Sequence, residues 1–247
     1  MHGTMKRVLS HGSVVAHRGC WSLFHPENSW TALKRAADNG CAIEIDVHLM
    51  KDGNVAVFHD FTLNRMCMRK GRLEELTRED VKDCKLRFSK EKIVFFDDLL
   101  KMVNGRIPIY VEMKCNGNEI ELCDALIKMT EGYEGDLVFI GFHPKAGAYM
   151  KEKGYAVGYS CAKPPKKLPY EADCMICHIW GVPWSKKKRD EYPPFVPWTI
   201  YGYLGKIHAK LVSKVAMYNT HLFLEYRKYY KRHGKMKNEE LKMKNEK

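Results

Sequence analysis

The sequence lacks several features that would define other protein classes. No segment approaches the run of about 18 apolar residues that a membrane span needs. The first dozen residues, MHGTMKRVLSHG, contain no apolar stretch and no small-residue cleavage site, so we expect no secretion signal. The nine cysteines are scattered without a disulfide framework. Free thiols in a cytoplasmic protein are therefore expected.

The chain has an excess of positive charge, with a formal net charge of +12. Such a charge favours anionic partners, which include phosphate esters, nucleic acids and membrane surfaces. Much of the excess lies in KKKRD (186–190) and in the tail from 228 to 247, where a solvated basic surface is the simplest interpretation. Only YRKYYKRH (226–233) interleaves basic and aromatic residues. Nucleic-acid binding is therefore not expected.

Apolar residues make up 45% of the 247 residues, which is enough for a buried core. Short strand-like runs alternate with amphipathic segments, among them 28–39, 119–130 and 206–217, and no internal repeat or long linker interrupts them. This alternation favours a parallel sheet with helical crossovers. The expected strands are 13–17, 41–49, 54–60, 107–114, 136–142, 155–161, 174–179, 195–200 and 221–226.

Nine strands are one more than an eight-stranded barrel requires. Asp52-Gly53 between two alternating runs predicts a β-hairpin, so 54–60 is the additional return strand. A two-residue loop would place His59 opposite Asp46. The remaining eight strands predict a TIM (β/α)₈ barrel, formed as one domain by residues 1–247. The long stretch 60–106 is predicted to be a small insertion over the C-terminal mouth, and 226–247 a basic C-terminal helix or tail.

Polar residues gather at the carboxyl ends of the predicted strands, where TIM barrels place their active sites. These residues are His17, Arg18, Glu44, Asp46, His59, Glu112 and Lys114. The three carboxylates offer hard oxygen ligands and suit one divalent cation, Mg²⁺ or Ca²⁺. Arg18 and Lys114 suit the charge of a phosphate ester. The two histidines can share the roles of base and acid, which indicates a metal-assisted phosphodiesterase.

Each of these residues also has a simpler interpretation. A histidine after a strand is more often a structural hydrogen-bonding group, and an E-x-D pair is often part of a salt-bridge pattern. Asn28 would serve as a helix N-cap, with Glu27 beside it at the positive end of the helix dipole. Their combination in one order along the chain favours the catalytic interpretation.

The motifs AHRG (16–19), PENS (26–29), IEIDVHLMKDG (43–53), VAVFHD (55–60), LNR (63–65) and VEMK (111–114) resemble those of the glycerophosphodiester phosphodiesterases. That family has a TIM-barrel fold and hydrolyses glycerophosphodiesters to glycerol 3-phosphate and an alcohol, often through a cyclic phosphate. The resemblance implies His17 and His59 as the acid–base pair, with Arg18 and Lys114 on the phosphate. It further implies Glu44, Asp46 and Glu112 as metal ligands, and Glu27 and Asn28 as supports of the first loop.

The resemblance is weaker after residue 114. Phe142 and Trp198, in segments that echo the family, are candidates for the substrate pocket. Gly141 stands where a serine is common, and FLEYR replaces the usual acidic end of the last strand, where Glu225 is a candidate substitute. Two alternatives remain open: a phospholipase-D-like or lysophospholipid phosphodiesterase acting at a membrane, and a non-catalytic barrel that binds a phosphoester.

Overall fold

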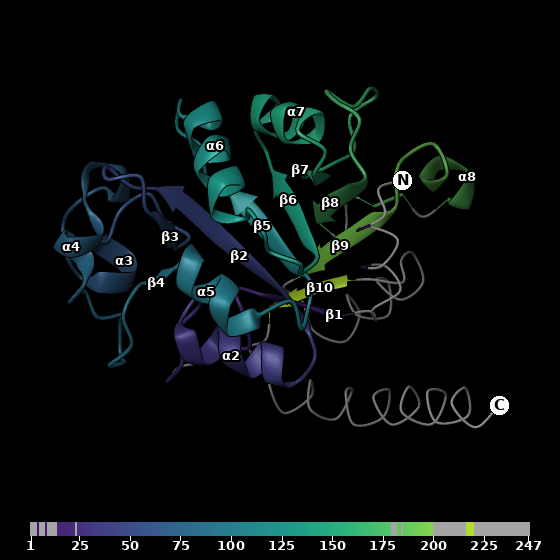
Figure 1. Cartoon of the computed structure of the whole chain (residues 1–247). Coiled ribbons are helices and arrows are strands. Elements are labelled where there is room, and N and C mark those ends of the chain that lie inside the picture. Colours follow the sequence, from purple (N-terminus) through teal and green to yellow (C-terminus); the bar gives the residue numbers. More distant parts are fainter. Residues whose placement is uncertain are drawn as a thin grey trace.

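A computed structural model describes residues 4, 8, 14–22, 24–178, 182–183, 185–199 and 216–219 (Figure 1). Within these ranges eight parallel strands form a closed ring, because β1 pairs with β2 on one edge and with β10 on the other. The protein is a TIM barrel, as predicted. The barrel strands are β1 (Val14–His17), β2 (Ala42–Leu49), β5 (Ile109–Met113), β6 (Leu137–Gly141), β7 (Ala156–Cys161), β8 (Cys174–His178), β9 (Phe195–Thr199) and β10 (Ala216–Asn219).

Alternate residues of these strands fill two separate cores. Those that point inward pack with one another along the barrel axis, and include Val15, Tyr110, Val138, Ile176 and Val196. Those that point outward pack beneath helices that surround the ring (Figure 1). These helices are α2 (Trp30–Asp38), α5 (Phe96–Val103), α6 (Glu119–Met129) and α7 (Pro144–Glu152). None of the helices described is long and apolar enough to cross a bilayer.

The prediction of the last strand was wrong. The eighth barrel strand is β10, Ala216–Asn219, which lies in and just after the segment 206–217 that was expected to be helical. It pairs in parallel with β9 and β1 and thereby closes the barrel. The segment 221–226, which was expected to form this strand, lies outside the described residues, as do Glu225 and the basic tail.

The hairpin after β2 exists, but its predicted register was wrong by one residue. The return strand β3 (Val55–Val57) runs antiparallel to β2, with Val47 opposite Val57. The backbone N–H of Phe58, rather than that of His59, donates to the Asp46 carbonyl oxygen over 2.9 Å. His59 therefore follows the paired part of the strand and does not lie opposite Asp46.

The length of the hairpin loop explains the shift in register. The N–H of Met50 donates to the carbonyl oxygen of Asn54 over 2.8 Å, which leaves three loop residues instead of two. Gly53, the last of them, has a φ of +80°, the left-handed conformation that closes three-residue hairpin loops. Asp-Gly thus marks the hairpin correctly and does not determine its loop length.

The segment after β3 folds around a small core of its own. Its elements are α3 (Asn64–Cys67), η1 (Leu73–Glu75), α4 (Arg78–Val81) and β4 (Val94–Phe95). Leu63, Leu73, Val81 and Phe95 pack together there with Phe58. Figure 1 shows these elements beyond the C-terminal end of β2. The helix α5 lies within the predicted insertion, yet it packs beside α2 as an outer helix of the barrel.

A close backbone contact beside the site gives a prediction about stability. Gly19 has a φ of +81°, and a Cβ atom there would lie 2.7 Å from the carbonyl carbon of Ala32 in α2. Gly53 has nearly the same φ, +80°, with nothing within 4 Å of a Cβ. We expect Gly19→Ala to destabilise the protein by about 3 kcal/mol and Gly53→Ala by about 1 kcal/mol. Urea unfolding of both variants measures this difference, and equal losses would show that the contact with Ala32 does not matter.

Candidate active site

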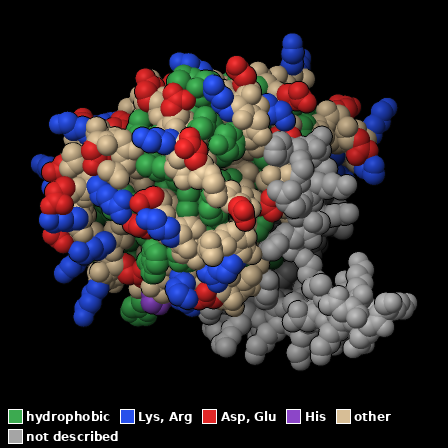
Figure 2. Space-filling model, viewed as in Figure 1, with side chains coloured by type: hydrophobic (Ala, Val, Ile, Leu, Met, Phe, Trp, Pro, Cys, Tyr) green, Lys and Arg blue, Asp and Glu red, His purple; other side chains and the backbone are tan. Residues whose placement is uncertain are grey.

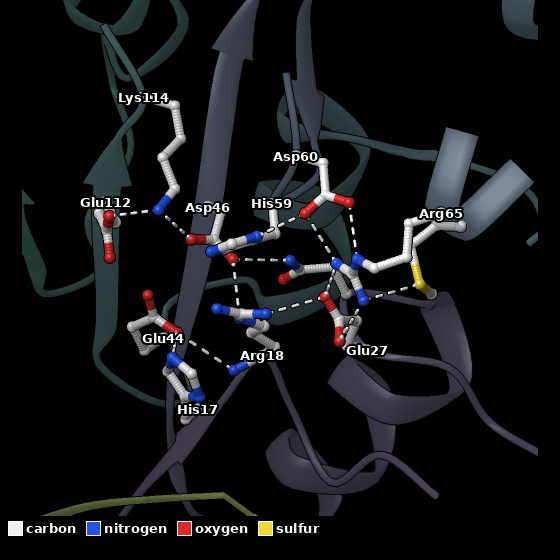
Figure 3. A network of polar contacts seen from close by, with 12 residues as sticks. His17, Arg18, Glu27, Glu44, Asp46, His59, Asp60, Arg65, Glu112 and Lys114 are labelled. Carbon is white, nitrogen blue, oxygen red and sulfur yellow. Dashed lines mark hydrogen bonds and ion pairs between the residues drawn. The ribbon is translucent and has the colours of Figure 1, made fainter. Parts of the chain in front are cut away.

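The register of the parallel strands brings the predicted polar residues together at the C-terminal end of the barrel. His17 pairs with Glu44 across β1 and β2, and Asp46 pairs with Glu112 across β2 and β5. Lys114 follows β5 directly. Because these neighbours share a level in adjacent strands, their side chains converge on one point (Figure 3).

Three carboxylates form the centre of the site. Glu44, Asp46 and Glu112 each offer an oxygen atom within 4.8 Å of the others, and the side chains of Glu44 and Asp46 are fully buried. Burial, with the neighbouring charges of Asp46 and Glu112, raises the pKa of Glu44 well above its ordinary value. The Oε1 atom of Glu44 is buried without a hydrogen-bond partner. The cluster thus holds more negative charge than its neighbours neutralise.

Two cations lie against these carboxylates. The Lys114 ammonium is 3.0 Å from Asp46 Oδ1 and also contacts Glu112. The Arg18 guanidinium lies 3.2 Å from Asp46 Oδ2. Burial would raise the pKa of the Asp46 carboxyl, but Lys114 and Arg18 hold it far below its usual value. The ionised form is thus favoured at Asp46 and disfavoured at Glu44.

The first loop is shaped by hydrogen bonds to this cluster. The backbone N–H of Arg18 donates to Glu44 Oε2 over 3.1 Å. The side-chain amide of Asn28 donates from Nδ2 to Asp46 Oδ2 over 2.9 Å. Both Arg18 and Asn28 adopt a positive φ, 57° and 55°. The N-cap of α2 is Ser29, whose hydroxyl accepts from the Ala32 N–H. Asn28 therefore braces the loop instead of capping the helix.

The two histidines lie in different surroundings. His17 is buried at the end of β1, with Nε2 3.8 Å from Glu44 Oε2. His59 is about one-third exposed, and its Nδ1 is 2.7 Å from Asp60 Oδ1. His59 also contributes to the low pKa of the Asp46 carboxyl, so it faces the cluster even though it is not paired with Asp46 on the strand. The Asp60 contact assigns the proton to Nδ1 and leaves Nε2 as an acceptor.

Sequence reasoning missed Arg65, which ties the two halves of the site together. Its guanidinium donates to Asp60 over 2.6 and 2.8 Å and to Glu27 over 2.7 and 3.2 Å. Glu27 in turn accepts from Arg18 over 2.9 Å. Burial opposes the ionisation of Asp60, yet hydrogen bonds from Arg65 and His59 hold its pKa at about 2. Arg65 and Asp60 both lie in quoted motifs, LNR and VAVFHD, which were signals that could have identified them.

A cavity of about 380 Å³ opens above the cluster. Five of the predicted polar residues border it: His17, Arg18, His59, Glu112 and Lys114. Phe142, a predicted pocket residue, also borders it and is 58% exposed. The opposite wall comes from the ends of β7 and β8, with Ser160 and His178 among its residues, which sequence analysis did not identify. The backbone of Trp198 lies in β9, next to His178.

The acidic cluster could hold a divalent metal ion. Its ligands would be carboxylate oxygens alone, which hard cations prefer. The buried and unpartnered Glu44 Oε1 provides a ligand atom that nothing else in the described structure satisfies. A cation at this position would also offset the repulsion that raises the pKa of Glu44. The residues present therefore fit a metal site.

Comparison with known proteins identifies the family. The sequence profile of the glycerophosphoryl diester phosphodiesterase family matches residues 17–140, a range that contains every candidate polar residue of the site. The chain belongs to this family. It is 32% identical over 146 residues to a glycerophosphodiester phosphodiesterase of Caldanaerobacter subterraneus, and 34% over 127 residues to the bovine glycerophosphodiester phosphodiesterase 1. These alignments cover 58% and 47% of this chain, and 54% and 38% of those proteins. The chain thus spans about half the length, or less, of the curated relatives it matches.

Solved structures agree with the family's barrel fold. A phosphodiesterase of Oleispira antarctica, solved in complex with sn-glycerol 3-phosphate, superposes with a TM-score of 0.78 at 20% identity. The superposition covers 88% of this chain and 95% of that one. At this identity the likeness supports the fold alone. The sequence motifs predicted both the glycerophosphoryl diester phosphodiesterase family and this arrangement of strands.

Proposed function

We propose that the protein is a metal-dependent glycerophosphodiester phosphodiesterase, which hydrolyses its substrate to glycerol 3-phosphate and an alcohol. The observation that carries the proposal is a cluster of three carboxylates beside a cavity that two cations and two histidines border. Membership of the family and the glycerol 3-phosphate named with the Oleispira antarctica structure support the substrate class. We further propose that it acts on a small molecule in the cytoplasm, without nucleic acid.

The phosphate group of the substrate would lie between Arg18 and Lys114. Both side chains border the cavity, and both are held in place by carboxylates. Arg18 is oriented by Glu27, so its guanidinium offers a fixed fork, while Lys114 supplies a point charge. Their positive charges would bind the anionic diester and oppose the negative charge that grows in the transition state.

His59 and His17 would exchange protons with the substrate. Asp60 fixes the tautomer of His59 and orients its ring, so Nε2 can accept a proton from the attacking hydroxyl. His17, buried beside Glu44, would then protonate the leaving oxygen. The attacking hydroxyl would belong either to the substrate, which gives a cyclic phosphate, or to water.

Glu44, Asp46 and Glu112 would hold one divalent cation, Mg²⁺ or Ca²⁺. When bound, such an ion polarises phosphoryl oxygens and lowers the pKa of a coordinated hydroxyl. The three carboxylates would hold it beside the cavity, which Glu112 borders. They also leave Arg18 and Lys114 oriented toward the substrate.

The test is release of glycerol 3-phosphate from glycerophosphoethanolamine and glycerophosphocholine, with Mg²⁺, with Ca²⁺ and with EDTA. Turnover that requires a divalent cation supports the proposal and identifies the metal. A second candidate, a lysophospholipid phosphodiesterase, is favoured by Phe142, which is exposed at the rim of the cavity and suits an acyl chain. Faster turnover of lysophosphatidylcholine than of glycerophosphocholine would support this second candidate.

Arg65 is expected to affect catalysis without touching the substrate. Arg65→Ala removes the contacts that hold Asp60 and Glu27, so we expect kcat/KM to fall roughly 10–100-fold, as for other groups that orient catalytic residues. Arg78→Ala is the matched control, because Arg78 also bridges two carboxylates, Asp97 and Asp98, but away from the cavity. The measurement is kcat/KM of both variants by steady-state kinetics. Equal losses would indicate general destabilisation instead of a role in the site.

A further inference from the structure

Two cysteines lie side by side where β7 and β8 reach the rim of the cavity. Cys161 and Cys177 are direct neighbours in the parallel register of these strands, so their side chains project from the same face of the sheet. Their sulfur atoms are 2.9 Å apart. Figure 1 shows the two strands adjacent in the barrel.

The side chains of the pair pack on the outer face of the barrel, and both residues also border the cavity. Cys177 packs there with Met175, Val182 and Phe195, whereas Ile176 points to the inner core. Cys177 is fully buried, whereas Cys161 is half-buried. The pair thus has one sulfur that a solute can reach and a second sulfur directly behind it.

We propose that Cys161 and Cys177 are a redox-active dithiol, which a low-molecular-weight disulfide converts reversibly into an intramolecular disulfide. The proposal concerns a modification site and does not depend on the hydrolase activity. Adjacent strands lie about 4.8 Å apart, within the range of about 4.4–6.8 Å between Cα atoms that a disulfide tolerates. The spacing of the two strands is therefore compatible with the bond.

The accessible sulfur is also the better nucleophile. The contact between the two sulfur atoms lowers the pKa of the Cys161 thiol, although burial opposes this. The same contact raises the pKa of Cys177, and burial raises it further. Cys161 is also the less buried of the two, so an external disulfide meets its sulfur first.

The reaction balances in two exchange steps. The Cys161 thiolate attacks one sulfur of the external disulfide, which forms a mixed disulfide and releases one thiolate. That thiolate takes up the proton that Cys161 lost. Cys177 then loses its proton and attacks the Cys161 sulfur, and the second external thiol leaves with that proton. Two protein thiols are oxidised and one external disulfide is reduced to two thiols.

The bond would affect the wall of the cavity. Cys161 and Cys177 border the cavity opposite His17 and Arg18, together with their neighbours Ser160, Ala162 and His178. A covalent link between the ends of β7 and β8 would fix the spacing of this wall. Oxidation of the pair would thus restrain one wall of the cavity.

The test is peptide mapping by mass spectrometry after incubation with oxidised glutathione, acid quenching and alkylation. We expect a Cys161–Cys177 linked peptide, lighter by two hydrogen atoms, that dithiothreitol removes. Cys161→Ser should lose the link and leave Cys177 as a free thiol. Cys177→Ser should accumulate glutathione on Cys161, because the second step is blocked. Cys67→Ser is the control, since Cys67 is also half-buried but lies in the insertion.

Three results would overturn the proposal. The first is that Cys161 and Cys177 both remain alkylated in the wild type at an excess of oxidised glutathione. The second is that the linked peptide persists in Cys161→Ser, and the third is that Cys177→Ser carries no adduct on Cys161. Thermal unfolding of each reduced variant confirms that it is folded before the mapping is interpreted.

Discussion

Replacement of either active-site histidine by alanine is expected to abolish nearly all phosphodiester hydrolysis. A positioned proton-transfer group contributes about 10²–10⁴ in rate, so kcat should fall by that factor in His17→Ala and in His59→Ala. Substrate affinity should change little, because Arg18 and Lys114 remain in the cavity. The measurement is glycerol 3-phosphate release at saturating glycerophosphodiester, with KM determined for each variant.

The double variant distinguishes a shared mechanism from two independent contributions. If His17 and His59 act in one proton-transfer sequence, the double variant should be little slower than the slower single variant, because groups that act as a unit are not additive. His25→Ala is the matched control. His25 lies in the loop that follows β1, contacts Glu91 and does not border the cavity. Full activity in either single variant would refute the proposed acid–base pair.

The residues that sequence analysis placed correctly are those whose position follows from strand periodicity. Glu44 and Asp46 are two apart on β2, and Glu112 lies at the level of Asp46 on β5, so parallel pairing alone brings them together. His17 joins them because it pairs with Glu44. A barrel with its polar residues at the C-terminal strand ends could therefore be predicted before any coordinates were known.

The errors arise where periodicity carries less information. The loop length at Gly53 depends on a single backbone conformation, and it changed the register by one residue. The strand β10 has only four residues, and a run of that length does not distinguish strand from helix. Arg65 reaches Glu27 only because the insertion folds back toward the first loop. The motif LNR marks Arg65 in the sequence, but it does not reveal this tertiary contact.

Replacement of one carboxylate of the acidic cluster is expected to lower kcat without lowering the stability of the protein. Glu44→Gln keeps the shape of the side chain and removes a buried negative charge beside Asp46 and Glu112. In EDTA the variant should therefore be as stable as the wild type or more stable, because a repulsion is lost. Its kcat in the presence of metal should fall on the order of 10²–10³-fold, the range for losing one group that stabilises transition-state charge.

Thermal unfolding with and without metal tests whether the fall in kcat of Glu44→Gln comes from lost metal binding. A ligand at 100 times its Kd stabilises the folded state by about 2.7 kcal/mol, which corresponds to a rise in Tm of about 5–10 °C for a chain of this size. Mg²⁺ or Ca²⁺ should produce this rise in the wild type and in Glu152→Gln, a control at an exposed position on α7. Glu44→Gln should show little of it. An equal rise in Glu44→Gln would place the metal elsewhere, whereas a loss of stability in EDTA would show that the Glu44 carboxylate is compensated within the protein itself.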